Sequence, residues 1–386
     1  MKNAILIKLR QKLILRNYHF CGKIFMGDYM DAIYERLDEK INELPWYVGD
    51  FIDQKRRKMA ATTLLNYCHD YIIFFNWLVS EGYYNGKSCE VDLATLEKLT
   101  VKHIEGFLTH LETLLNNSKI TVNRKISALK SLFHYLQNVA ETPDLEPYIY
   151  RNVMAKIDFN HVKEDIETIA NRIEGKILHD DEYEQFRQFI AFDYGKRHIS
   201  NKKLYNFHLK NRERDTALVS LILGSGLRLS EVSGLDLDDI DYKKHSVHVI
   251  RKGGKEQYVY FSEQAMSDIQ EYLRIRESRY QLPKKEKALF VSTAIGPHKT
   301  SRRLSNRAIE KIIEKYAVAF GKPALSVHKL RHSFATRYHK ENNDIPKLKK
   351  HLGHSSVQTT MIYTHMTNKE MKAAIDHMDR RDDDED

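Results

Sequence analysis

The stretch Ser326–Met366, SVHKLRHSFATRYHKENNDIPKLKKHLGHSSVQTTMIYTHM, concentrates side chains that can act on a phosphate ester. His328 and Arg331 are three residues apart, which places them on one face of a helix. His354 follows 23 residues after Arg331, and Tyr363 follows nine residues after His354. On short neighbouring helices, two imidazoles, a guanidinium and a phenol can together bind and attack a phosphodiester.

Each residue type in this stretch has a chemical use and a plainer alternative. Arginine offers phosphate oxygens a rigid fork, and histidine donates or shuttles a proton near pH 7. Tyr363 stands among apolar residues and could serve only in packing. His328 and His332 have the spacing of a metal-binding pair, but Lys329 replaces the glutamate of a His-Glu-x-x-His motif. We therefore expect neither a metal nor a cofactor.

A second candidate phosphate-binding set lies upstream, in Leu223–Lys255. Gly224 and Gly226 precede Arg228, and Glu231 then falls in the first turn of an expected short helix. A glycine-rich turn lets the backbone approach a ligand closely, and a helix N-terminus attracts anions. We expect Glu231 to orient the region of Arg228 or His328.

The segment SVHVIRKGGKEQYVYF, residues 246–261, predicts two antiparallel strands. Gly253 and Gly254 form the expected hairpin turn, with Lys252 at its tip. On its own, Arg-Lys-Gly-Gly-Lys is more typical of a solvated turn than of a functional site.

Taken in order, these motifs resemble the tyrosine recombinase (phage-integrase-like) family, Xer type. They are Ser-Gly-Leu-Arg-Leu-Ser-Glu, the Lys252 hairpin, His-x-x-Arg-His, Leu-Gly-His and the late tyrosine. The separations match as well: 24 residues from Arg228 to Lys252, 23 from Arg331 to His354 and nine from there to Tyr363.

The resemblance covers about residues 211 to 379, and two phrases outside it point to one branch. LPWYV at 44–48 and EPYIYRNVM at 146–154 resemble the single-protein XerS-like branch. The family implies a mainly α fold. It has an N-terminal all-helical DNA-clamping (SAM-like core-binding) domain and a C-terminal, mostly helical catalytic domain with a small antiparallel sheet.

The family also implies a role for each matched residue. Arg228 and Arg331 hold the non-bridging phosphate oxygens, and His354 adds a hydrogen bond. Tyr363 attacks and forms a 3′-phosphotyrosyl bond. In the same scheme His328 is the candidate base and Lys252 protonates the departing 5′-oxygen. No ATP is needed, because the covalent bond keeps the energy of the broken phosphodiester.

The partners implied by the resemblance are a double-stranded dif-like DNA site, a homotetramer on that DNA and the septal DNA translocase FtsK. The expected role is the resolution of chromosome dimers during cell division. Three alternatives stay open: an integrase or transposase of a mobile element, a type IB topoisomerase-like enzyme, and a basic architectural protein with an inactive site.

Composition narrows the class of protein independently. The chain has 386 residues, enough for two domains, and 42% are hydrophobic without an apolar run long enough to span a membrane. A net charge of +9 favours an anionic partner, nucleic acid first. The three cysteines are too few for a disulfide framework or a zinc ribbon, which fits a reducing cytoplasm.

Hydrophobic periodicity and charge divide the chain into five parts. We expect a basic extension at 1–26, a helical core-binding domain at 27–155, a polar linker at 156–175, the catalytic domain at 176–380 and an acidic tail at 381–386. Residues 1–25 could form a basic amphipathic helix. We expect instead that they lie upstream of a natural start at Met26.

In the first domain the pattern predicts helices at 31–44, 60–79, 101–115 and 121–139. Arg124 and Lys125, beside the apolar stripe of the last helix, are candidate DNA-phosphate contacts. In the second domain it predicts helices at 178–192, 212–224, 229–235, 262–279, 303–320 and 368–378, a loop at 195–210 and a strand at 288–291. The family resemblance implies that the final helix docks on a neighbouring protomer; packing on its own domain is the equally open alternative.

Overall fold

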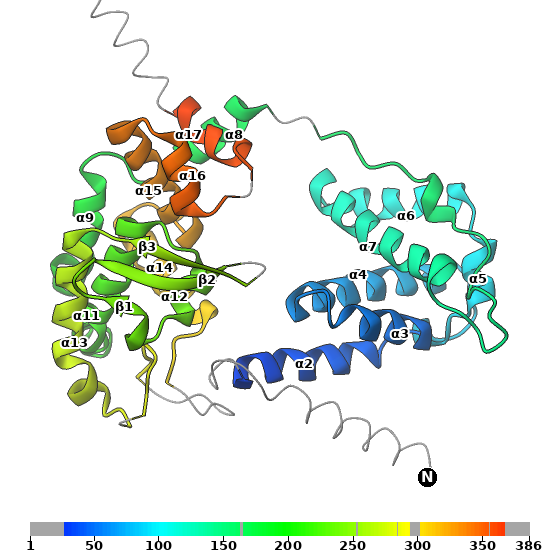
Figure 1. Cartoon of the computed structure of the whole chain (residues 1–386), viewed down its shortest axis with the longest axis horizontal. Coiled ribbons are helices and arrows are strands. Elements are labelled where there is room, and N and C mark those ends of the chain that lie inside the picture. Colours follow the sequence, from blue (N-terminus) through cyan, green and yellow to red (C-terminus); the bar gives the residue numbers. More distant parts are fainter. Residues whose placement is uncertain are drawn as a thin grey trace, which may run out of the picture. The chain divides into compact units, whose positions relative to one another are not determined.

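The computed structural model describes residues 27–162, 165–251, 254–283, 285–293, 302–354 and 356–366. The chain separates into two compact units, Met1–Lys163 and Glu164–Asp386. Both are dominated by helices, and the second also contains a small antiparallel sheet (Figure 1). The predicted fold class is therefore confirmed.

The first unit is all-helical (Figure 1). Its helices are α2 (Gly27–Ile41), α3 (Trp46–Lys55), α4 (Ala61–Ser80), α5 (Leu93–Lys98), α6 (Val101–Thr113) and α7 (Lys119–Asn138), with 3₁₀ turns at Ser88–Glu90 and Val153–Lys156. Asp92, Thr100 and Ser118 cap α5, α6 and α7 by accepting hydrogen bonds from backbone N–H groups in the first turn. The four predicted helices are present. Helices α3 and α5 are additional.

Aromatic side chains fill the core of this unit. Phe74, in α4, is completely buried, and its ring meets Phe107 of α6 edge-on at 5.2 Å and Phe133 of α7 at 6.4 Å. Edge-to-face pairs of this kind add to the stabilisation from burial. The aromatic run of α4 is thus a packing element, as the sequence predicts.

The second unit packs its helices against a three-stranded sheet at one side (Figure 1). Its helices are α8 (Ile166–Glu174), α9 (Glu182–Gln188), α10 (Tyr194–Lys196), α11 (Lys202–Ser225), α12 (Leu229–Gly234), α13 (Glu263–Tyr280), α14 (Asn306–Phe320), α15 (Val327–Asn342), α16 (Ile345–Leu352) and α17 (Gln358–Met366). A π-helical turn at Phe189–Asp193 joins α9 to α10, and a 3₁₀ turn at Leu237–Asp239 precedes the sheet.

The sheet has the order β1 (Ile240–Asp241), β2 (Ser246–Arg251) and β3 (Lys255–Tyr260), all antiparallel. Val247 pairs with Val259, and both side chains are buried. Arg251 pairs with Lys255 at the end of the predicted hairpin, so the hairpin itself is confirmed. Its tip, Lys252 and Gly253, lies outside the described residues.

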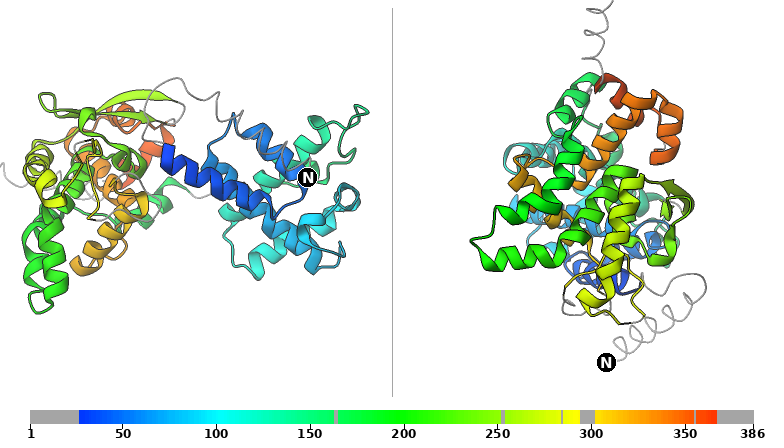
Figure 2. Two further views of the ribbon diagram at one scale, coloured as in Figure 1. Left: turned by 90° about the horizontal axis from the view of Figure 1, so that it is seen from below. Right: turned by 90° about the vertical axis from the view of Figure 1, so that its left-hand side faces the viewer.

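Two expectations for the second unit were wrong. Residues 195–210 were expected to be a loop, but α10 and the first turns of α11 occupy most of that range. Asn201 caps α11, and His208, although polar, is buried against Tyr316. In the left view of Figure 2 these green helices extend away from the sheet. Residues 288–291 form only isolated bridges, at Ala288 and Val291.

The expected linker at 156–175 is also partly helical. Asp165 caps α8 by accepting from Thr168 N–H at 2.6 Å, and Ala170 and Ile173 are buried in a cluster with α17. A nine-residue helix is marginal alone, so packing on α17 is what stabilises it. Residues 368–378, expected as a final helix, lie outside the described part, as do 1–26 and 381–386.

Lys125 does not occupy the position expected of a phosphate contact. It is 5% exposed, and its ammonium donates to Asp70 of α4 at 2.8 Å. Position 125 is three residues after buried Val122 and four before buried Leu129, so the helical repeat turns it inward. The side chain of Arg124 is 46% exposed and also pairs with Asp70, and Arg124 stays a candidate DNA contact.

Replacing Asp70 by alanine should destabilise the first unit by about 3–5 kcal/mol, because the ammonium of Lys125 is left buried without its counter-charge. Both tryptophans of the chain, Trp46 and Trp77, lie in this unit, so tryptophan fluorescence during urea unfolding of the full chain reports on it. Asp53→Ala is the control. It removes an exposed pair with Arg56 and should cost about 0–1 kcal/mol. An Asp70→Ala variant as stable as the control would contradict the assignment.

Candidate active site

The site begins at a turn that only glycine fits well. Gly226 ends α11 with φ of 67°, a left-handed conformation, and a Cβ at this position would lie 2.5 Å from the ring of Phe334. The turn leads directly to Arg228, which is the N-cap residue of α12. Gly226 therefore positions an arginine, and no anion is needed to explain it.

Arg331, in α15, is the most enclosed charge of the group. It is 3% exposed, and its guanidinium donates to the carbonyl oxygens of Gly226 at 2.5 Å and Leu352 at 2.7 Å. Burial, followed by the nearby Arg228, lowers the pKa of Arg331 to about 10. The side chain therefore remains a cation at neutral pH, and backbone carbonyls fix its orientation.

Arg228 is held by Glu231 and by the loop after α16. Its Nη1 donates to Glu231 Oε1 at 2.9 Å and its Nη2 to the Gly353 carbonyl at 3.1 Å. The Arg228 backbone N–H donates to the other oxygen of Glu231, also at 2.9 Å. Glu231 is 8% exposed. Its buried carboxylate is therefore held in place and can orient the side chain of Arg228.

Arg251, which the sequence analysis did not single out, lies against the same anchor. Its Nε is 3.4 Å from Glu231 Oε1, and its Nη2 donates to the His351 carbonyl at 2.9 Å. A Cβ on Gly353 would fall 1.6 Å from Arg251 Nη1, so the glycine of Leu-Gly-His makes room for this arginine. Its position beside Lys252 in Arg-Lys-Gly-Gly-Lys was the available signal.

His354 lies between Arg331 and α17. Its Nε2 is 3.1 Å from Arg331 Nη2, and its Nδ1 is 2.9 Å from Thr360 Oγ1. Because arginine only donates, Nε2 is the acceptor and Nδ1 carries the proton. Burial, followed by the positive charges of Arg331 and Arg228, lowers the pKa of His354 to about 4. The imidazole is therefore neutral at pH 7.

Tyr363 is buried and bonded to a histidine other than the expected one. It is 1% exposed, and its hydroxyl lies 2.9 Å from His332 Nδ1. The Nε2 atom of His332 lies 2.9 Å from that of His328. Burial raises the pKa of Tyr363 to about 12, although Arg331 and Arg228 act in the opposite direction. His332 thus stands between the phenol and the histidine proposed as its base.

The structure brings five of the six matched residues together. They are Arg228, His328, Arg331, His354 and Tyr363, supplied by the turn before α12, by α15, by the loop after α16 and by α17. Arg228, His328 and Arg331 also line a cleft of about 440 Å³. Lys252, the sixth, lies outside the described residues. Ala170 and Ile173 of α8 pack in the cluster that contains Tyr363.

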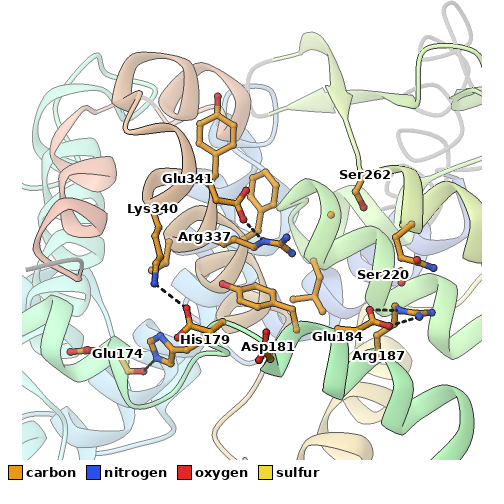
Figure 3. A pocket seen from close by; sticks show the side chains of 18 residues that line it. Glu174, His179, Asp181, Glu184, Arg187, Ser220, Ser262, Arg337, Lys340 and Glu341 are labelled. Carbon is orange, nitrogen blue, oxygen red and sulfur yellow. Dashed lines mark hydrogen bonds and ion pairs between the residues drawn. The ribbon is translucent and has the colours of Figure 1, made fainter. Parts of the chain in front are cut away.

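A larger cavity of about 990 Å³ lies beside α9 and α15 and contains none of the six (Figure 3). Its arginine and lysine side chains already have partners, among them Arg337, which pairs with Glu341 at 2.8 Å, and Lys340, which pairs with Asp180 at 3.0 Å. Because these cationic side chains are already in ion pairs, the cavity offers an anion little to bind. The smaller cleft, with two arginines, is the candidate site.

Among the described residues, no group of three or more histidine, cysteine, aspartate or glutamate side chains could hold a metal ion. None of their helices is long and apolar enough to cross a membrane.

Comparison with known proteins identifies the family. The phage integrase family model matches residues 197–370, and the phage integrase N-terminal SAM-like domain matches residues 54–138. Tyrosine recombinase XerS of Streptococcus gordonii is 38% identical over 359 residues, which is 90% of this chain and 99% of the relative. XerS of Streptococcus thermophilus is 37% identical, also over 359 residues, with the same coverage of 90% of this chain and 99% of the relative.

Solved structures agree on the fold. XerH site-specific recombinase bound to a palindromic difH substrate superposes with a TM-score of 0.60 at 22% identity, covering 83% of this chain and 81% of that one. A lambda integrase dimer bound to a COC′ core site gives 0.51 at 16% identity, with coverage of 83% and 94%. The chain therefore belongs to the Xer-type tyrosine recombinases of the phage integrase family. It is a tyrosine-type site-specific DNA recombinase.

The buried neutral histidines make stability depend on pH. Burial lowers the pKa of His208 and His354 to about 4 and of His332 to about 3, from the ordinary 6.5. Between pH 6.5 and about 4 the unfolded chain binds protons that the folded chain does not. The free energy of unfolding should therefore fall with falling pH, by up to about 1.4 kcal/mol per pH unit for each group.

Thermal unfolding between pH 7.5 and 5, followed by circular dichroism, measures this slope. His208→Gln removes one buried imidazole and should make the loss at low pH smaller. His69→Gln, at an exposed position, is the control and should leave the slope unchanged. Equal slopes for all three proteins would show that His208 is not a neutral buried group.

Proposed function

We propose that this enzyme cuts and rejoins double-stranded DNA at a dif-like site through a 3′-phosphotyrosyl bond to Tyr363. In this proposal it resolves chromosome dimers during cell division, in the cytoplasm. The observation that carries the proposal is the convergence of two arginines and a histidine beside the buried hydroxyl of α17.

The first requirement of the reaction is to neutralise the phosphate. Arg228 and Arg331 supply two cations that the folded protein already holds in place through Glu231 and backbone carbonyls. Donors positioned before the reaction stabilise the charge that develops on the non-bridging oxygens without reorganising. His354 lies beside Arg331 and is held by Thr360; it can donate to the phosphate once its proton moves to Nε2.

In the proposed cleavage step, each bond that forms is matched by one that breaks. The Tyr363 oxygen bonds to phosphorus, and the bond from phosphorus to the 5′-oxygen breaks. The phenolic proton leaves toward the His332–His328 pair, and Lys252 gives a proton to the 5′-oxygen. One phosphodiester replaces another, so a 5′-hydroxyl from a second strand can reverse the step and complete an exchange.

The proposed partner is double-stranded DNA, in a homotetramer that acts on it two protomers at a time. The basic balance of the chain, +9, supports an anionic partner, and exposed Arg124 is a candidate phosphate contact in the first unit. The XerS relatives and the XerH–difH complex support a dif-like site. Resemblance alone suggests activation by FtsK.

The test uses a duplex with a candidate dif-like site, nicked near the expected cleavage position so that the 5′-hydroxyl fragment diffuses away. With EDTA present and ATP absent, denaturing electrophoresis should show protein attached to DNA. Tyr363→Phe should abolish the adduct, because it removes the attacking oxygen and keeps the packing. Tyr338→Phe, a matched loss of one hydroxyl on α15, should leave it unchanged.

The outcomes separate the alternatives. An adduct that forms equally on unrelated sequence would favour the topoisomerase-like activity, and one confined to the ends of a mobile element would favour an integrase. Tight binding to the site without any adduct, even with FtsK added, would favour an architectural protein. An adduct that survives Tyr363→Phe would exclude Tyr363 as the nucleophile.

A further inference from the structure

We infer that His332 relays the phenolic proton from Tyr363 to His328. The relay rests on the proposed cleavage reaction. As Tyr363 attacks, its O–H bond breaks and an Nδ1–H bond forms on His332. The Nε2–H bond of His332 breaks in turn, and a new N–H bond forms at His328 Nε2. His328 ends as an imidazolium, His332 ends as the other neutral tautomer, and the path reverses on rejoining.

The geometry supplies the two links that a relay requires. The hydroxyl of Tyr363 is 2.9 Å from Nδ1 of His332, and Nε2 of His332 is 2.9 Å from Nε2 of His328. The two histidines are four residues apart on α15, so one helix face presents both, with their rings nearly perpendicular at 79°. Tyr363 enters from a different helix, α17.

The tautomer in which the phenol donates sets the direction of the whole chain. In it, Nδ1 of His332 is the bare acceptor and its proton sits on Nε2. That N–H then donates to His328 Nε2, whose own proton must sit on Nδ1. In this tautomer each proton points away from the tyrosine, as the proposed relay toward His328 needs.

Burial explains why His332 passes the proton on. His332 is 7% exposed, whereas His328 is exposed and lines the cleft with Arg228 and Arg331. Burial, then His328, Lys329, Arg331 and His354, lowers the pKa of His332 to about 3, so it does not hold a positive charge at neutral pH. The exposed His328 can release the proton to water.

The decisive variant is His332→Asn. The asparagine side-chain oxygen falls close to the place of Nδ1 and can still accept from Tyr363, but asparagine has no second nitrogen to reach His328. The rate of adduct formation at pH 7 should fall about 10²–10⁴-fold, the usual contribution of a positioned proton acceptor. Affinity for the same duplex should change by less than about twofold, because His332 does not line the cleft.

The pH profile distinguishes a relay from a structural role. Without the relay, hydroxide must take the proton, so the rate for His332→Asn should rise by about tenfold per pH unit between pH 6.5 and 8.5. The wild-type profile should be flatter. His339→Asn removes another buried histidine of α15, two turns further on, and is the control for loss of packing. It should keep the wild-type profile.

A measurement on the wild-type chain covers the case in which the variant does not fold. The substrate carries sulfur in place of the bridging 5′-oxygen, so the leaving thiolate needs no proton. The single-turnover rate is then followed in mixtures of H₂O and D₂O. A relay moves two protons and predicts a curved dependence on the deuterium fraction. A linear dependence, from one moving proton, would overturn the relay.

The remaining outcomes separate the relay from the alternatives. A wild-type chain without any adduct contradicts the proposed function itself. If wild type forms the adduct and His332→Asn is equally fast, the relay is wrong. A faster variant would mean that His332 restrains Tyr363, and a variant slowed equally at every pH would mean that His332 only supports the fold.

Discussion

The hydrogen bonds of the buried Arg331 guanidinium are the interactions on which the candidate active site depends. Its two carbonyl partners, Gly226 and Leu352, belong to segments 126 residues apart, the end of α11 and the end of α16. Taking a charge out of water is costly unless its donors are satisfied, so these segments are held where they meet Arg331. The same guanidinium lies beside His354, which ties the loop before α17 to the site.

A second constraint follows from the burial of Tyr363, the proposed nucleophile. Tyr363 is 1% exposed and packs in one cluster with Ala170 and Ile173 of α8. Its hydroxyl cannot meet a phosphate that stays in bulk solvent, so the proposed cleavage would require the surroundings of α17 to rearrange when DNA binds. Because α8 directly follows the boundary between the two units, the packing that covers Tyr363 adjoins the segment connecting them.

Much of the fold and of the candidate site could be predicted, because local sequence patterns indicate these elements directly. Helical periodicity, the glycine turn before Arg228 and the paired strands around residues 252–253 were visible in the sequence. The failures came where tertiary packing decides. Lys125 was placed on the surface although the helical repeat turns it toward Asp70, and residues 195–210 were taken for a loop. His332 was considered only as a metal ligand, because nothing in the spacing shows that α17 brings a phenol to its Nδ1.

The most direct test of the account is to identify the residue that carries the DNA. The covalent complex is digested with nuclease and protease, and the peptide that retains a nucleotide is sequenced by mass spectrometry. The account predicts a single modified peptide, with a 3′-linked nucleotide on Tyr363. A nucleotide on any other side chain, or one joined through its 5′-phosphate, would contradict the arrangement of the active site described here.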